Sequence, residues 1–153
     1  QGMALAKRYK LKKPLREAIA HHHGTTLVYY FYHKAKEQQG ENGSVGESEY
    51  RYPGPRARRK EIVLVGLADS CEAACRSLSK PTPGKIAGMV DSIVTDRIRQ
   101  HELDCADLTF AELAIARENI IRTLGTMLHA RVPYQKDAAH ETGAGQTGET
   151  TAT

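Results

Sequence analysis

The chain of 153 residues has no tryptophan, and only 6% of its residues are aromatic. Together with 40% hydrophobic and 26% charged residues, this scarcity predicts a soluble, single-domain protein with an aliphatic, helical core. Long apolar runs are also missing, because the longest, residues 27–32 and 62–68, fall far short of the roughly 18 residues of a transmembrane helix. We therefore expect a chain that does not span a membrane, and its first residues lack the pattern of a signal peptide.

Cysteine is scarce as well, and its three positions, Cys71, Cys75 and Cys105, are an odd number without the spacing of a zinc site. We expect reduced thiols that serve as small core residues in a cytosolic compartment. The sequence has no glycine-rich phosphate loop, no nucleophile elbow, no paired CxxC motif and no dinucleotide fingerprint. These absences set aside the enzyme classes that depend on such motifs.

Apolar residues recur at helical spacing in six segments, which predicts an all-helical fold. Gly24 ends the second helix, Thr25 or Thr26 caps the third, and Thr109 with Glu112 forms a capping box for the last. Apolar residues spread widely around the helix at 60–79, so we expect it to be central and buried on most sides. The expected helices cover residues 2–9, Pro14 to the histidine run, about 27–37, 60–79, 83–98 and 109–129.

Two stretches lack periodicity. Residues 38–59 are rich in Gly, Ser, Glu, Pro and Arg and predict an exposed loop, and residues 135–153 predict a disordered tail. Residues 50–56 interleave aromatic rings with cations, a combination that can stack a base and hold a phosphate. The alternative is a solvated loop stiffened by its prolines. The candidate substrate contacts are Arg51, Tyr52 and Arg56, with Arg76 further along the chain.

The residue types of a metal site are found in His22, His23 and Asp69, because imidazoles and carboxylates together suit first-row divalent metals. Adjacent histidines on one helix point about 100° apart, so they would more easily bind on different sides of a two-metal centre, or contact one metal and one substrate oxygen, than chelate a single ion. A histidine at a helix end is also commonly a solvated cation. An aspartate inside an apolar helix is rarely left without a partner. A salt bridge to Arg76 would satisfy Asp69 as well as a metal ion would. His101, His129 and His140 are interpreted as surface or structural histidines.

Seven segments follow one another in the order and spacing of a known domain: residues 19–32, 50–55, 67–78, 81–83, 102–104, 107–109 and 129–134. Together they resemble the cytoplasmic HD domain of the bacterial seven-transmembrane HD family, whose characterised members are cyclic di-AMP phosphodiesterases. The resemblance implies an all-α, HD-type helical bundle, truncated at its N-terminus, in which residues 1–134 form the C-terminal part of the domain. The parent protein would be anchored in the bacterial inner membrane with this domain in the cytoplasm.

For the site, the resemblance implies two divalent ions, iron or manganese, that hydrolyse a cyclic dinucleotide to its linear form. Its metal ligands fall on His22, His23 and Asp69, and a metal-activated water, with no side chain as nucleophile, attacks phosphorus. The family's earlier histidines and its His-Asp doublet have no counterpart here, so we expect the chain alone to be inactive. No nucleic-acid partner is expected under this interpretation. The alternative is a non-catalytic helical module that binds a nucleotide or nucleic acid through residues 50–60.

Overall fold

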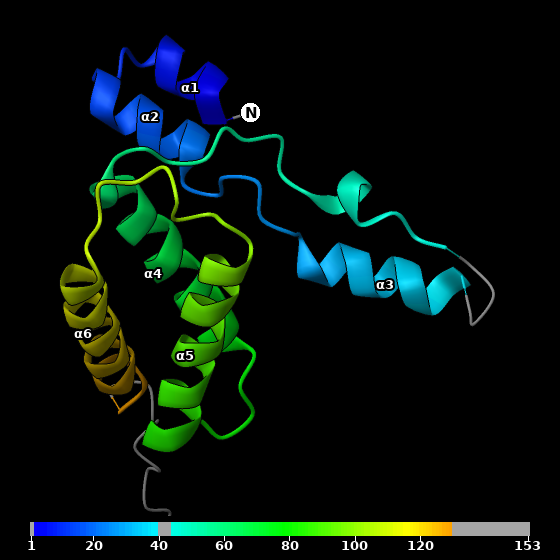
Figure 1. The fold of residues 1–153 in the computed structure, drawn as a ribbon, viewed down its shortest axis with the longest axis vertical. Helices are drawn as coiled ribbons and strands as arrows, with labels where there is room; N and C mark the ends of the chain where they lie inside the picture. Colours follow the sequence, from blue (N-terminus) through cyan, green and yellow to red (C-terminus); the bar gives the residue numbers. More distant parts are fainter. Residues whose placement is uncertain (1, 40–43, 130–153) are drawn as a thin grey trace, which may run out of the picture.

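The computed structural model describes residues 2–39 and 44–129, and within them the chain is helical (Figure 1). An antiparallel bridge between Leu27 and Arg51 is the only strand-like pairing in these residues. The predicted all-α fold is confirmed, and the expected tail at 135–153 lies outside the described residues. The elements are α1 (Gly2–Arg8), α2 (Lys13–His21), α3 (Tyr29–Gln39), the 3₁₀ helix η1 (Glu47–Tyr50), α4 (Lys60–Arg76), α5 (Pro83–Arg99) and α6 (Phe110–His129).

Helices α4, α5 and α6 pack against one another and hold the core between them (Figure 1). Helix α4 is central, as predicted, but it buries one face only. Val65 is 48% exposed and Asp69 is exposed, so the expectation of burial on most sides was wrong. The apolar residues that this face and its partners bury are Ile62, Val63, Leu67, Cys71, Cys75, Ile86, Val90, Val94, Leu113 and Leu124.

The predicted starts of the last two helices are confirmed by their caps. Pro83 opens α5 after Thr82, whose hydroxyl accepts a hydrogen bond from the Lys85 amide at 3.3 Å. At α6 the Thr109 hydroxyl accepts from the Glu112 amide at 3.2 Å, and the Glu112 carboxylate accepts from the Thr109 amide at 2.9 Å. These reciprocal bonds satisfy backbone donors that a helix start leaves unpaired.

The remaining helices lie around this bundle. Helices α1 and α2 pair with each other near the start of α4, whereas α3 projects away beside η1 (Figure 1). Helix α3 begins two residues later than expected, because backbone bonds hold the preceding residues: the Val28 amide donates to the Tyr50 carbonyl at 2.8 Å, and the Tyr52 amide to the Thr26 carbonyl at 3.0 Å. Neither threonine caps it, since the Thr26 hydroxyl donates to the His23 carbonyl at 2.7 Å and the Thr25 hydroxyl to Glu102.

The segment expected as one exposed loop at 38–59 is more structured than its composition indicates. Helix α3 extends through Gln39, η1 covers four residues, and Ala57 joins the core at 5% exposure. The prediction that all three cysteines are small core residues needs one correction. Cys71 and Cys75 are free and buried, but Cys105 is exposed. Among the described residues, no helix combines the length and the apolar character needed to cross a bilayer.

Candidate metal centre and its cleft

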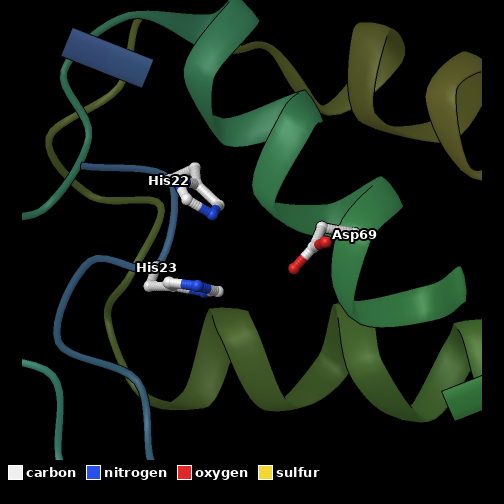
Figure 2. A group of neighbouring side chains, drawn as sticks. All are labelled: His22, His23 and Asp69. Atoms are coloured by element: carbon white, nitrogen blue, oxygen red, sulfur yellow. The ribbon is translucent and has the colours of Figure 1, made fainter. Parts of the chain in front are cut away.

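His22, His23 and Asp69 lie together although the aspartate is 46 positions beyond the nearer histidine in the sequence. One ligand atom from each residue lies within 4.8 Å of the others. Both imidazole rings point toward the carboxylate on α4 (Figure 2). The predicted three residues therefore form one cluster, the only group of this size and composition in residues 2–39 and 44–129.

The two histidines do not diverge as neighbours on one helix would. Helix α2 ends at His21, His22 is its C-cap, and His23 lies in the turn that follows. Their ring centroids are 4.0 Å apart with a 38° tilt. The end of the helix therefore lets both rings face the same carboxylate, whereas the 100° separation expected along a helix would have sent them apart.

One hydrogen bond decides how His22 can act. Its Nδ1 lies 2.6 Å from the carbonyl oxygen of Ala18, and since a carbonyl only accepts, Nδ1 must donate. The proton is then on Nδ1, which leaves the Nε2 lone pair available for a metal ion. Histidines that bind metals are commonly oriented by a bond of this kind from the second ring nitrogen.

Gly66 in α4 brings the histidine segment close to the helix. A Cβ atom at this position would meet the His22 carbonyl oxygen closer than the 3.0 Å that real Cβ atoms keep. It would also lie 3.1 Å from the carbonyl carbon of His22. The absence of a side chain at Gly66 thus lets the His22 backbone rest on α4, three residues before Asp69 on the same helix.

His23 lies between its histidine neighbour and Tyr52. The Tyr52 ring stacks on His23 with centroids 4.2 Å apart and an 11° interplanar angle. Burial lowers the pKa of His23, and His22 lowers it further, against the opposing effect of Asp69. The surroundings thus favour the neutral imidazole, which is the form that binds metal.

Asp69 does not form the salt bridge to Arg76 that was the alternative to metal binding. Arg76 instead bonds Glu72, with Nε donating to the carboxylate at 2.6 Å. Within the described part of the chain, Asp69 forms no ion pair. Its carboxylate is exposed and directed at the histidines (Figure 2).

A cleft of about 410 Å³ opens beside this cluster, in the size range of small-molecule sites. His23 and Asp69 line it, and of the four predicted substrate contacts only Tyr52 does. The arginines of the loop have internal acceptors. Arg51 donates to the Thr25 carbonyl and to the Gln100 side chain, both at 3.0 Å, and Arg56 donates to the Gln100 carbonyl at 3.3 Å.

A buried carboxylate holds the turn that follows the histidines. Glu102, 5% exposed, accepts a hydrogen bond from the Thr25 amide at 3.0 Å and another from the Thr25 hydroxyl. Arg56 lies 3.8 Å from the same carboxylate. Gly24, at φ 56°, leaves space for it, since a Cβ there would clash with Glu102. The connection between α5 and α6 therefore fixes the turn that carries His22 and His23.

Four of the residues that shape the site were not predicted. Gly66 and Glu102 position the histidine segment, and Ser70 and Arg97 line the cleft. A signal existed for Gly66, because an isolated glycine inside an apolar helical pattern commonly marks a close backbone approach. Ser70 and Arg97 carry no such signal, since only the packing of α4 on α5 brings them together.

The donor set fits one divalent ion. Two ligand atoms each about 2.1 Å from an ion can be at most about 4.2 Å apart, so separations within 4.8 Å require only a small movement. Two imidazoles and one carboxylate also leave coordination positions open, as sites that perform chemistry do. The residues therefore form a possible His/Asp metal site on a cleft.

The sequence is similar to two curated phosphodiesterases. It is 40% identical over 136 residues to the cyclic-di-AMP phosphodiesterase PgpH of Listeria monocytogenes and 38% identical over 133 residues to PgpH of Bacillus subtilis. These matches cover 89% and 87% of the chain but only 18% of each relative. No protein-family model matches.

A solved structure agrees with these matches. The L. monocytogenes PgpH HD domain, crystallised in complex with cyclic-di-AMP, superposes with a TM-score of 0.75 at 40% identity. The match covers 82% of this chain and 57% of that domain. The chain thus spans over half of the crystallised domain and less than a fifth of the complete relatives.

Proposed function

We propose that this chain, which is homologous to the HD domain of PgpH, is part of a metal-dependent phosphodiesterase domain that hydrolyses cyclic di-AMP to its linear form. Residues 1–134 would be the C-terminal part of that domain. The observation that carries the proposal is the convergence of His22, His23 and Asp69 at the edge of the cleft. By the same homology, the parent protein would be anchored in the inner membrane with this domain in the cytoplasm.

Each of the three residues has a definite part in holding the ion. His22 would bind through Nε2, because its Nδ1 proton is engaged by Ala18. His23 would bind as the neutral imidazole that its surroundings favour. Asp69 would supply negative charge from a carboxylate without an ion pair in the described residues. A divalent ion at such a site supplies Lewis-acid stabilisation of a phosphoryl oxygen and an activated water for attack on phosphorus.

The cleft would hold the nucleotide beside the ion. Tyr52 lines it and presents an aromatic ring on which a base can stack. The internal bonds of Arg51 and Arg56 give no support to the alternative of a non-catalytic module that binds through residues 50–60.

In the proposal the complete domain holds two ions, iron or manganese, which share these ligand types. Three protein ligands are enough for one ion with open positions, and a second ion needs further ligands. The described residues supply no second cluster. We therefore expect the 153-residue chain to bind manganese weakly and to leave cyclic di-AMP intact.

Manganese titration of the purified chain, followed by calorimetry, tests the site. We expect His22→Ala and Asp69→Asn each to weaken binding by at least about tenfold. His101→Asn is the matched control, because His101 pairs with Asp104 at the surface and its φ of 60° suits asparagine. Equal manganese binding by all four proteins would refute the metal site, and chromatographic detection of linear product from the wild-type chain would refute its inactivity.

A further inference from the structure

Arg97 in α5 is a cation on the wall of the cleft. It is the only positively charged side chain among the described residues that line this cleft, which it shares with His23 and Asp69. One guanidinium nitrogen donates to the Ser70 hydroxyl at 2.6 Å. The backbone is fixed too, because the Arg97 carbonyl accepts from the Glu102 amide at 3.0 Å. The head group is therefore held beside the predicted metal ligands.

Two carboxylates near Arg97, those of Asp96 and Glu102, have other partners. Asp96, also on the cleft, lies 4.0 Å from Arg99, and Glu102 is bonded by Thr25 and lies 3.8 Å from Arg56. In residues 2–39 and 44–129 no carboxylate forms an ion pair with Arg97.

The free donors of Arg97 give it capacity for an anion. A guanidinium has five N–H donors, and Ser70 accepts from only one of its nitrogens. Burial lowers the pKa of Arg97, but a guanidinium keeps its charge at neutral pH. Glu102 and Asp96 oppose the effect of burial on the pKa of Arg97, but neither forms an ion pair with it in the described residues. A partly buried cation is costly unless an anion meets it, and a guanidinium matches the oxygens of a phosphate in bidentate geometry.

We propose that Arg97 binds a phosphate of the cyclic dinucleotide in the cleft, next to the metal ligands. The inference rests on the proposed function and adds a substrate contact to it. It replaces Arg51, Arg56 and Arg76, which do not line the cleft, as the arginine that recognises the anion. Ser70 is a positioning residue, which holds the guanidinium without itself meeting the substrate.

The experiment measures two affinities of the full chain: that of manganese alone, and that of cyclic di-AMP in the presence of manganese. We expect Arg97→Gln to weaken cyclic di-AMP binding by about 10- to 100-fold, as loss of a charged hydrogen bond does, and to change manganese affinity by less than threefold. Arg97→Lys should recover part of the loss, because it restores the charge without the fork. Arg122→Gln, an exposed arginine on α6 that does not line the cleft, is the matched control and should bind like wild type.

A second ligand separates phosphate recognition from a structural role. Adenosine has no phosphate, so Arg97→Gln should leave its affinity unchanged, whereas a disordered cleft would weaken both ligands. Thermal melting by circular dichroism checks the fold of each variant. Equal binding of cyclic di-AMP by wild type and Arg97→Gln would overturn the assignment while leaving the metal site intact. Absence of any cyclic di-AMP binding by the wild-type chain would overturn both it and the proposed function.

Discussion

Substitution of Gly66 by alanine isolates the close contact between α4 and the histidine segment. A methyl group at this position would lie closer than 3.0 Å to the His22 carbonyl oxygen and 3.1 Å from the carbonyl carbon. Both atoms belong to the backbone, so no side-chain rotation relieves the clash. The segment must move by roughly an ångström to restore ordinary contact, and His22 moves with it.

Gly88 in α5 is the matched control for this substitution. It is exposed within a helix, and a Cβ there has no atom within 4 Å. Alanine at Gly88 should raise the free energy of unfolding by about 0.5–1 kcal/mol, because glycine is the poorer helix former. The same gain applies at Gly66, but overpacking there costs about 1–3 kcal/mol. The difference between the two variants therefore isolates the clash, at about 1–3 kcal/mol.

Urea unfolding followed by circular dichroism measures both variants, and manganese calorimetry measures the site. We expect Gly66→Ala to be the less stable of the two and to bind manganese at least about tenfold more weakly, since movement of one ligand disturbs the whole cluster. Gly88→Ala should bind manganese like wild type. If both variants gained stability equally and kept the same manganese affinity, the contact with Gly66 would not position the site.

Two further predictions concern the bundle. The Lys60 ammonium and the cap at the start of α6 lower the pKa of Glu112 to about 2. The stabilising effect of this carboxylate is therefore present above pH 4.5 and is lost as the pH falls through about 2. The stability difference between wild type and Glu112→Gln, measured from urea midpoints, should shrink over that interval. Burial raises the pKa of Cys71 to about 11, so in the native chain at pH 8 a thiol reagent should label Cys105 rapidly and leave Cys71 and Cys75 unlabelled until denaturant is added.

Local chemistry made the ends of some helices predictable. The capping box of Thr109 and Glu112 forms as predicted, because both partners lie within one helical turn. The start of α3 was misplaced because its determinant is distant in sequence: residues 50–52 pair with residues 26–28 and hold them extended. Composition likewise indicated an exposed loop at 38–59 and could not show that Ala57 reaches the core.

The candidate ligands were predictable as residue types, but their arrangement was not. Helical periodicity places His22 and His23 on different faces, whereas the helix ends at His21 and the rings converge. The apolar neighbours of Asp69 in the sequence indicated a carboxylate in need of a partner, yet Leu67 and Cys71 are buried on another face of α4 and Asp69 is exposed. The geometry of the cluster depends on where α2 ends and on which face α4 buries, and both are settled by tertiary packing.

The arginines show most clearly where inference from sequence reaches its limit. Arg51 and Arg56 lie among aromatic residues and were chosen as phosphate contacts. Both, however, donate hydrogen bonds to Gln100, and Arg56 also forms an ion pair with Glu102, more than 40 residues away in the sequence. Arg97 lies in an amphipathic helix with nothing local to distinguish it, and its carboxylate neighbours are engaged elsewhere. Whether a cation is free to bind an anion depends on these distant partners, so the contact map, and not the local composition, identifies Arg97.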